Sequence, residues 1–239
     1  VSVFVNNGNG TFATKVDYSV AGGVYFVGIG DLNGDGKADL AVTNTTTNSI
    51  SVLMNNGNGT FATKVDYATG NDPRSVVIGD LNGDGKPDLA TANIGTDDSI
   101  SILINNGDGT FATKVDYTAG FDPRSIAMGD LNSDGRLDLA VADWNSSSVS
   151  VFINKGNGTF ATKVDYLTGD NIPSYPESVV IGDLNGDGKP DLAVANYNNS
   201  YTVSVFLNNG NGTFATKVDY LTGANPESVD IGDLNGDGK

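Results

Sequence analysis

The chain has 239 residues, enough for a large core in one or two domains. It carries 13 Lys and Arg against 29 Asp and Glu, a formal charge of −16, so nucleic acid and anionic membranes are unfavourable partners. His and Cys are both absent, which removes the usual zinc ligands, disulfides and His-based catalysis. No apolar run approaches the roughly 20 residues that span a bilayer, so we expect no membrane insertion.

A long repeat runs through the whole sequence. Its most constant segment, FATKVDY, begins at Phe12, Phe61, Phe111, Phe160 and Phe214. Successive copies are 49, 50, 49 and 54 residues apart. In chain order, residues 1–18 correspond to the last two strands of one repeat, four complete repeats follow, and residues 228–239 begin another. Such a period indicates a repeat architecture.

Each complete repeat predicts four short strands, which the third repeat illustrates. We expect strands over 125–130, 137–143, 149–154 and 160–166, because these segments are rich in Val, Ile, Phe and Tyr and are bounded by Gly, Asn, Asp or Ser. The first strand is the most apolar and contains Gly, which suits a crowded inner position. The last carries mixed charge, which suits an exposed outer edge.

A nine-residue motif, Asp-x-Asn-x-Asp-Gly-x-x-Asp, follows the first strand of each repeat. Oxygen side chains at positions 1, 3, 5 and 9, with a backbone carbonyl at position 7, form a cage for a hard cation. Three carboxylates without N or S donors favour Ca²⁺ over Zn²⁺ or Cu²⁺, and a flexible loop with more than six ligand atoms disfavours Mg²⁺. We therefore expect four calcium ions, one for each complete loop.

The predicted ligands, with Lys or Arg at position 7 acting through its carbonyl, are Asp31, Asn33, Asp35, Lys37 and Asp39; Asp80, Asn82, Asp84, Lys86 and Asp88; Asp130, Asn132, Asp134, Arg136 and Asp138; and Asp183, Asn185, Asp187, Lys189 and Asp191. An incomplete and weak fifth site consists of Asp233, Asn235 and Asp237.

Two other interpretations of the motif are weaker. An EF-hand or dockerin loop needs an oxygen ligand near position 12 and flanking helices. Position 12 is instead Val42, Thr91, Val141 or Val194, and the residues that follow alternate as in a strand. Asn-Gly and Asp-Gly are also ordinary turn formers, but reuse of all four ligand positions in every repeat favours the cation site.

Repeated four-stranded units of this length indicate a β-propeller. An open β-solenoid or a string of small domains is the alternative, although a single unit has too little apolar content to bury its own core. The segment GDLNGDGKPDLAVAN, followed by VSVFLNNGNGTF, resembles the FG-GAP/VCBS repeat, the blade of integrin alpha-subunit propellers and of many bacterial surface proteins. This resemblance covers essentially the whole chain. It implies that the cation loop joins the first two strands of each blade and binds calcium.

We therefore predict an all-β fold in which residues 1–239 form a single propeller domain of antiparallel four-stranded blades. The expected blades are 24–67, 75–117, 125–166 and 178–220, plus a closing blade made from 228–239 and 1–18 that lacks one strand. The five blades make either a complete ring or part of a larger one. Because the sequence stops inside a cation loop, we expect neighbouring segments of a longer chain.

Antiparallel strands place the loops alternately on two faces of the ring. The cation loops share one face with the NNGNGT loops and vary little, whereas the loops on the other face differ between repeats. Binding residues tend to lie on varied loops held by a rigid scaffold. The candidates on this variable face are Trp144, Tyr197, Tyr201, Phe121, Arg74 and Arg124. Neutral drift, with aromatic side chains packing between blades, is the alternative.

Three functions are compatible with the sequence. The first is a calcium-stabilised module of a secreted or cell-surface protein, which binds a protein or glycan through the variable face. The second is a lectin-like carbohydrate-binding propeller. The third is the non-catalytic propeller portion of a polysaccharide-degrading enzyme. Without His, and without a polar cluster outside the repeat, we do not expect this chain itself to be an enzyme.

Overall fold

The computed structural model describes residues 1–169, 173–197 and 201–236. These residues form strands, turns and loops, and they contain no helix that could cross a membrane.

Four antiparallel sheets, each with its strands in chain order, make up most of the molecule. Blade 1 consists of β3 (Val24–Gly30), β4 (Asp39–Asn44), β5 (Ser49–Leu53) and β6 (Val65–Ala68). Blade 2 consists of β7 (Pro73–Gly79), β8 (Asp88–Asn93), β9 (Ser99–Leu103) and β10 (Val115–Thr118). Blade 3 consists of β11 (Pro123–Gly129), β12 (Asp138–Asp143), β13 (Ser148–Phe152) and β14 (Val164–Leu167). Blade 4 consists of β15 (Pro176–Gly182), β16 (Asp191–Asn196), β17 (Thr202–Phe206) and β18 (Val218–Leu221).

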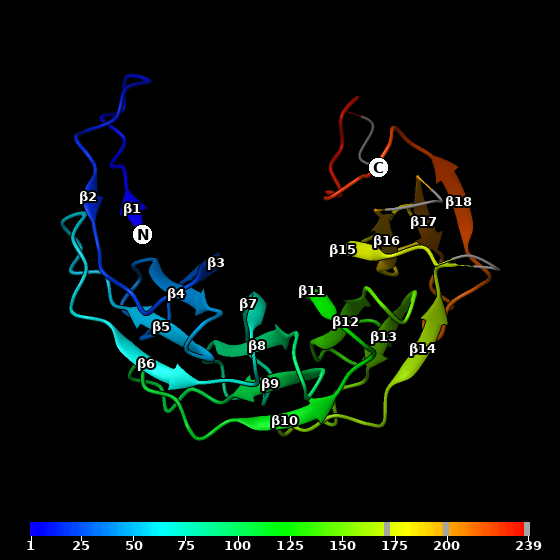
Figure 1. The fold of residues 1–239 in the computed structure, drawn as a ribbon, viewed down its shortest axis with the longest axis horizontal. Coiled ribbons are helices and arrows are strands. Elements are labelled where there is room, and N and C mark those ends of the chain that lie inside the picture. The colour runs from blue at the N-terminus through cyan, green and yellow to red at the C-terminus, as the bar shows by residue number, and fades with distance from the viewer. Residues whose placement is uncertain (170–172, 198–200, 237–239) are drawn as a thin grey trace.

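The blades follow one another around an open arc, with the first strand of each blade on the inside and the last on the outside (Figure 1). The inner strands line an axial cavity of about 770 Å³. The predicted all-β propeller fold is confirmed, as are the inner position of the apolar first strand and the outer position of the charged last strand.

The strand boundaries differ from the predicted ones at both ends of the blade. In blade 3 the first strand begins at Pro123, two residues earlier than expected. The last begins at Val164, because Phe160 makes only an isolated bridge to Asn154 and then turns toward the preceding blade. There its ring meets Tyr117 edge to face at 5.6 Å between centroids, and its N–H donates to the Tyr117 hydroxyl (3.4 Å). FATKVDY therefore forms a contact between blades.

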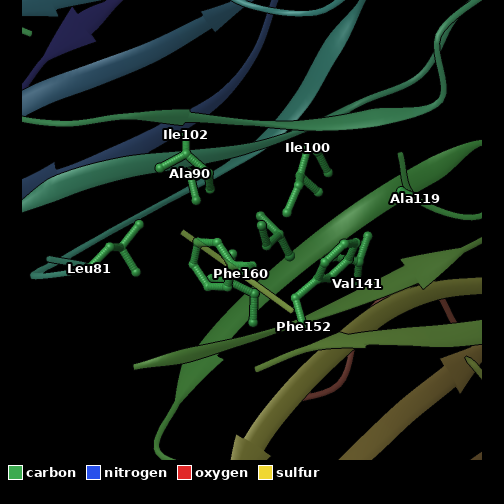
Figure 2. Close-up of a cluster of buried hydrophobic side chains, with 11 residues drawn as sticks. Leu81, Ala90, Ile100, Ile102, Ala119, Val141, Phe152 and Phe160 are labelled. Atoms are coloured by element: carbon green, nitrogen blue, oxygen red, sulfur yellow. The ribbon is translucent and has the colours of Figure 1, made fainter. Parts of the chain in front are cut away.

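Hydrophobic core lies mainly between neighbouring blades. We call the side of a blade that meets the next blade its trailing face, and the side that meets the previous blade its leading face. Figure 2 shows the junction of blades 2 and 3, where Phe152 and Phe160 on a leading face gather with Leu81 and Ile102 on a trailing face. All four side chains are buried. Since one blade cannot cover its own apolar sides, the repeats stabilise one another.

The two ends of the arc lie apart (Figure 1). At one end, β1 (Ser2–Val3) and β2 (Val16–Asp17) pair only with each other and pack on blade 1 through Val1, Val3 and Tyr18. At the other, Ile231 lies against Gly182, as Ile181 lies against Gly129 one blade earlier. Among the described residues after β18 there is no strand. The closing blade is thus not assembled in this structure, and its formation stays a prediction.

Candidate cation loops and the variable loop face

The cation loops fold around their first Asp. In the loop between β3 and β4, the Asp31 carboxylate accepts hydrogen bonds from the N–H groups of Gly34 (2.8 Å), Asp35 (3.1 Å) and Gly36 (2.8 Å). The loops beginning at Asp80 and Asp183 repeat these three bonds. Left-handed backbone at the two glycines makes this wrapping possible, because only a residue without Cβ adopts it freely.

The Asp at position 9 is buried and joins two loops of its blade. In blade 3, the Asp138 carboxylate accepts from Leu131 N–H (2.9 Å) in the cation loop and from Asn154 N–H (2.8 Å) after β13. Asp39, Asp88 and Asp191 make the equivalent pair of bonds. Burial raises the pKa of Asp138 to about 6; the two N–H donors oppose that rise, and Asp134 and Asp130 add to it.

These loops fit a divalent cation by charge and by donor type. Each combines a desolvated carboxylate with further carboxylates nearby, a repulsion that a bound cation relieves. The only opposing charge within a loop is the side chain at position 7, such as Lys37 Nζ, which lies 2.9 Å from Asp35. Within the described ranges, no three acidic side chains are placed close enough together to hold a metal ion. Calcium binding by these residues therefore stays a prediction.

The fifth loop is described only in part. Asp233 accepts from the N–H groups of Asn235 (3.2 Å) and Gly236 (2.7 Å), as the first Asp of a complete loop does. Asp237 lies outside the described residues. The weak site predicted at Asp233, Asn235 and Asp237 remains untested.

The variable face is organised by one irregularity in the first strand of each blade. The pairing register shifts between Pro123 and Ser125, so that Arg124 is an extra, bulged residue. Arg74 in blade 2 and Glu177 in blade 4 occupy the same bulge, and Tyr25 and Phe26 occupy it in blade 1. A bulge redirects a side chain away from the regular alternation of the sheet. These side chains consequently form one set near the axis.

Arg124 and Trp144 form the centre of the candidate ligand site. The guanidinium carbon of Arg124 lies 3.8 Å from the Trp144 ring centroid, and its Nη1 donates to Glu177 Oε2 (3.1 Å). The Trp144 ring also meets Tyr175 and Tyr197, at 5.2 and 5.1 Å between centroids. This stack joins the β12–β13 loop of blade 3 to blade 4, where Tyr175 directly precedes β15 and Tyr197 directly follows β16. Cation–π and ring contacts of this kind hold a site rigid.

Beside this stack lies a pocket of about 350 Å³, lined by Tyr25, Arg124, Trp144, Glu177, Tyr197 and Glu227. Burial raises the pKa of the Glu177 carboxyl, Arg124 opposes the rise, and Glu227 and Asp122 add to it. The pocket thus offers aromatic faces, a guanidinium and two carboxylates. Sequence reasoning did not propose Glu177 or Glu227; the signal was their position directly after a Pro, where other repeats carry Arg74 and Arg124.

Three of the six predicted ligand-face residues line this pocket, namely Trp144, Tyr197 and Arg124. Arg74 lies outside it and stacks on Tyr25, 4.5 Å from the ring centroid. Phe121 is exposed and lines two other pockets, of about 380 and 370 Å³. Tyr201 lies in the β16–β17 loop, is exposed and is not among the residues that line the pocket. The six candidates therefore divide between one clustered site and separate surface positions.

The fold and its repeated loops define the chain as a β-propeller. The model of the FG-GAP-like repeat matches residues 1–42, 31–91, 91–141, 130–194 and 183–239, so the chain belongs to the FG-GAP-like repeat family. This confirms the resemblance seen in the sequence. No curated protein sequence matches the chain.

Solved structures with similar folds differ in function. An Agrocybe aegerita lectin that recognises non-reducing terminal N-acetylglucosamine is 21% identical, with a TM-score of 0.62, over 91% of this chain and 59% of its own. A Bacteroides fragilis protein assigned as a 6-phosphogluconolactonase is 18% identical, with a TM-score of 0.66, over 97% and 67%. BBS1N, in complex with ARL6DN, is 14% identical, with a TM-score of 0.58, over 95% and 63%. These likenesses show the fold alone, and the chain spans about three fifths of the lectin.

Proposed function

We propose that the chain is a calcium-stabilised β-propeller module of a secreted or cell-surface protein, which binds a protein or glycan ligand on its variable face and is not itself catalytic. One contrast carries this proposal. Every complete blade keeps the same buried Asp, with the same two backbone hydrogen bonds to it, on one face. The other face gathers Trp144, Arg124 and Glu177 around a pocket.

Calcium would supply the positive charge that the loops lack. Each ion at a free concentration 100-fold above its Kd stabilises the fold by about 2.7 kcal/mol. Bound calcium would therefore raise the melting temperature by roughly 10 °C or more for a chain of this size.

The calcium proposal is tested by melting the protein in excess chelator and in millimolar calcium or magnesium. We expect a large rise in melting temperature with calcium and a smaller one with magnesium. Calorimetric titration should give four sites per chain, and Asp35→Ala should remove one of them. Melting curves that coincide with and without calcium would refute the proposal.

A lectin-like function is the second candidate, and the lining of the pocket favours it. Sugar rings stack on aromatic side chains, while their hydroxyls donate to carboxylates and accept from a guanidinium. Trp144, Glu177 and Arg124 offer these three kinds of contact around one cavity. The similar fold of a lectin adds only that such a scaffold can carry a sugar site.

A glycan array and a displayed peptide library, probed side by side, separate the two kinds of ligand. We expect one library to contain binders that Trp144→Ala abolishes and Phe121→Ala leaves unchanged, since Phe121 lies outside the pocket. Binders that survive Trp144→Ala would place the ligand elsewhere on the module. The calcium experiment is independent of this result.

A further inference from the structure

The N-terminal hairpin (residues 1–18) exposes two aromatic side chains whose counterparts in blades 3 and 4 are buried. Phe4 and Phe12 occupy the repeat positions of Phe152 and Phe160 on the leading face of blade 3. Those two side chains are buried, whereas Phe4 is 57% exposed and Phe12 is 60% exposed. The two exposed rings meet edge to face at 6.4 Å. One end of the arc thus carries a preformed leading face without a partner among the described residues.

The other end of the arc is hollow where such aromatic rings would fit. Beside blade 4 lies a cavity of about 510 Å³, lined by Leu184, Ala193, Val203 and Val205 of the blade and by residues of the segment 229–235 that follows it. The equivalent residues on the trailing face of blade 2 are Leu81, Ala90, Ile100 and Ile102, and all four are buried against blade 3 (Figure 2). The cavity therefore lacks the group that the hairpin displays.

The contact between the Tyr and Phe rings of successive FATKVDY segments also relates the two ends of the arc. At each of the four internal junctions, the Tyr of one FATKVDY segment meets the Phe of the next, with centroids 5.1 to 5.6 Å apart. Tyr220, the last of these tyrosines, is 57% exposed. Its missing partner would be a Phe in the position of Phe12.

A close approach at glycine completes the match. A Cβ on Gly212 of blade 4 would lie only 2.6 Å from the Cδ1 end of the Ile153 side chain of blade 3, and the φ of 75° at Gly212 also favours glycine. Gly10 in the hairpin is the equivalent glycine, and a Cβ built on it would meet no atom within 4 Å. Leu207, the equivalent of Ile153, is 39% exposed on blade 4. Each end holds one half of the same contact.

We propose that the trailing face of blade 4 binds the N-terminal hairpin of a second copy of this chain, head to tail. The occupant is inferred from the internal junctions. Blades 3 and 4 fill the same surface of the preceding blade with Phe, Gly and Phe, in the order that the hairpin supplies, and blades 1 and 2 fill it with Leu, Gly and Phe. The chain's own hairpin lies at the opposite end of the arc (Figure 1). Because the two surfaces differ, the contact is heterologous, and copies can add in succession.

Sedimentation velocity with light scattering tests the proposal, at constant calcium and between about 10 and 500 μM, where weak protein contacts become populated. We expect the mean mass to rise with concentration. Phe4→Ser with Phe12→Ser removes the leading half, and Leu207→Ser with Tyr220→Ser removes the trailing half. Either double variant should weaken association at least about 10-fold, since buried aromatic anchors dominate such contacts.

Phe121→Ser is the matched control, because Phe121 is 69% exposed but lies outside both surfaces; it should associate like the parent chain. Circular dichroism and melting curves verify that each variant folds, which is expected because the altered side chains are exposed. An equimolar mixture of the two double variants is decisive. Each retains one intact half, so the mixture should form dimers that grow no further.

Three results would overturn the proposal. A parent chain that remains monomeric at every concentration has no such contact. A monomer whose sedimentation slows in the leading-face variant is closing on its own hairpin rather than on a second copy. Association that the mixture fails to restore, or that both variants retain, uses some other surface.

Discussion

The two loop faces of this propeller are built on the same backbone but constrain their residues differently. On the cation-loop face, a buried Asp accepts the same two backbone N–H groups in blades 1 to 4. On the variable face, the equivalent bulge holds Arg in two blades and Glu in the next. Two backbone N–H groups, present in every blade whatever its sequence, require an acceptor side chain at the same position. A bulged side chain contacts only the side chains around it, so its identity can vary between blades. The first face therefore preserves the fold, and the second can acquire a ligand.

Removing a position-9 Asp should give the largest effect on stability. Asp88→Ala leaves Leu81 N–H and Asn105 N–H buried without an acceptor. We expect a loss of about 3 kcal/mol or more in the free energy of unfolding, even in chelator. Denaturant titration measures it. The control is Asp84→Ala in the same loop, whose exposed carboxylate should matter by under about 1 kcal/mol in chelator. Equal losses for the two variants would contradict the structural role assigned to Asp88.

Asp143 is a buried residue that differs between blades, so its replacement tests how much such a departure costs in stability. It ends β12 where the other three blades carry Asn, and burial raises its pKa to about 7 although Ser150 donates to it. The folded protein thus holds a proton that the unfolded chain releases near pH 4, so stability should fall as pH rises from about 4 to 7. Asp143→Asn should remove this loss.

We expect Asp143→Asn to stabilise the protein by roughly 2–3 kcal/mol at pH 8 and by much less at pH 4. Unfolding curves at several pH values measure the difference. Asn93 in blade 2 donates to two Ser side chains and provides the pattern for the replacement. A benefit that does not change with pH would mean that Asp143 is ionised in the folded state.

Trp144 is a packed aromatic residue on the variable face, and Phe121 is an exposed one, so replacing each of them compares the two environments. Trp144→Ala removes contacts with Arg124, Tyr175 and Tyr197 and should destabilise the protein by about 1–2 kcal/mol. Phe121→Ala should change stability by less than about 0.5 kcal/mol. Thermal melting compares the two variants. A larger loss at Phe121 would show that the exposed ring packs in solution.

The smallest predicted effect concerns the one cation loop that departs from the repeat. Ser133 has a φ of 62°, at a position where the other complete loops have Gly with φ between 74° and 82°. Ser133→Gly should relieve about 1 kcal/mol of backbone strain, and Gly83→Ser should introduce a similar amount. Denaturant midpoints measured in chelator report the change in backbone strain without a contribution from metal binding. The comparison fails if both changes move stability in the same direction.

Much of the fold could be predicted from local sequence. The spacing of FATKVDY and the alternation of apolar residues gave the number of complete blades and the order of their strands, because strand pairing within a blade joins segments close in the chain. The same locality made the cation loops recognisable, since all their proposed ligands lie within nine residues. The strand ends at Pro123 and Val164 were less predictable, because a bulge and a contact with the neighbouring blade set them.

The sequence by itself determined the repeating unit, the acidic loops and the two faces on which loops lie. Only the tertiary structure decided which variable residues meet: it placed Arg124, Trp144 and Glu177 around one pocket and left Phe121 outside it. It also left Phe12 and Tyr220 exposed, although their counterparts in the other repeats meet each other across blade junctions. Both results depend on how blades pack, and that packing joins residues about one repeat apart, so no short sequence pattern encodes it.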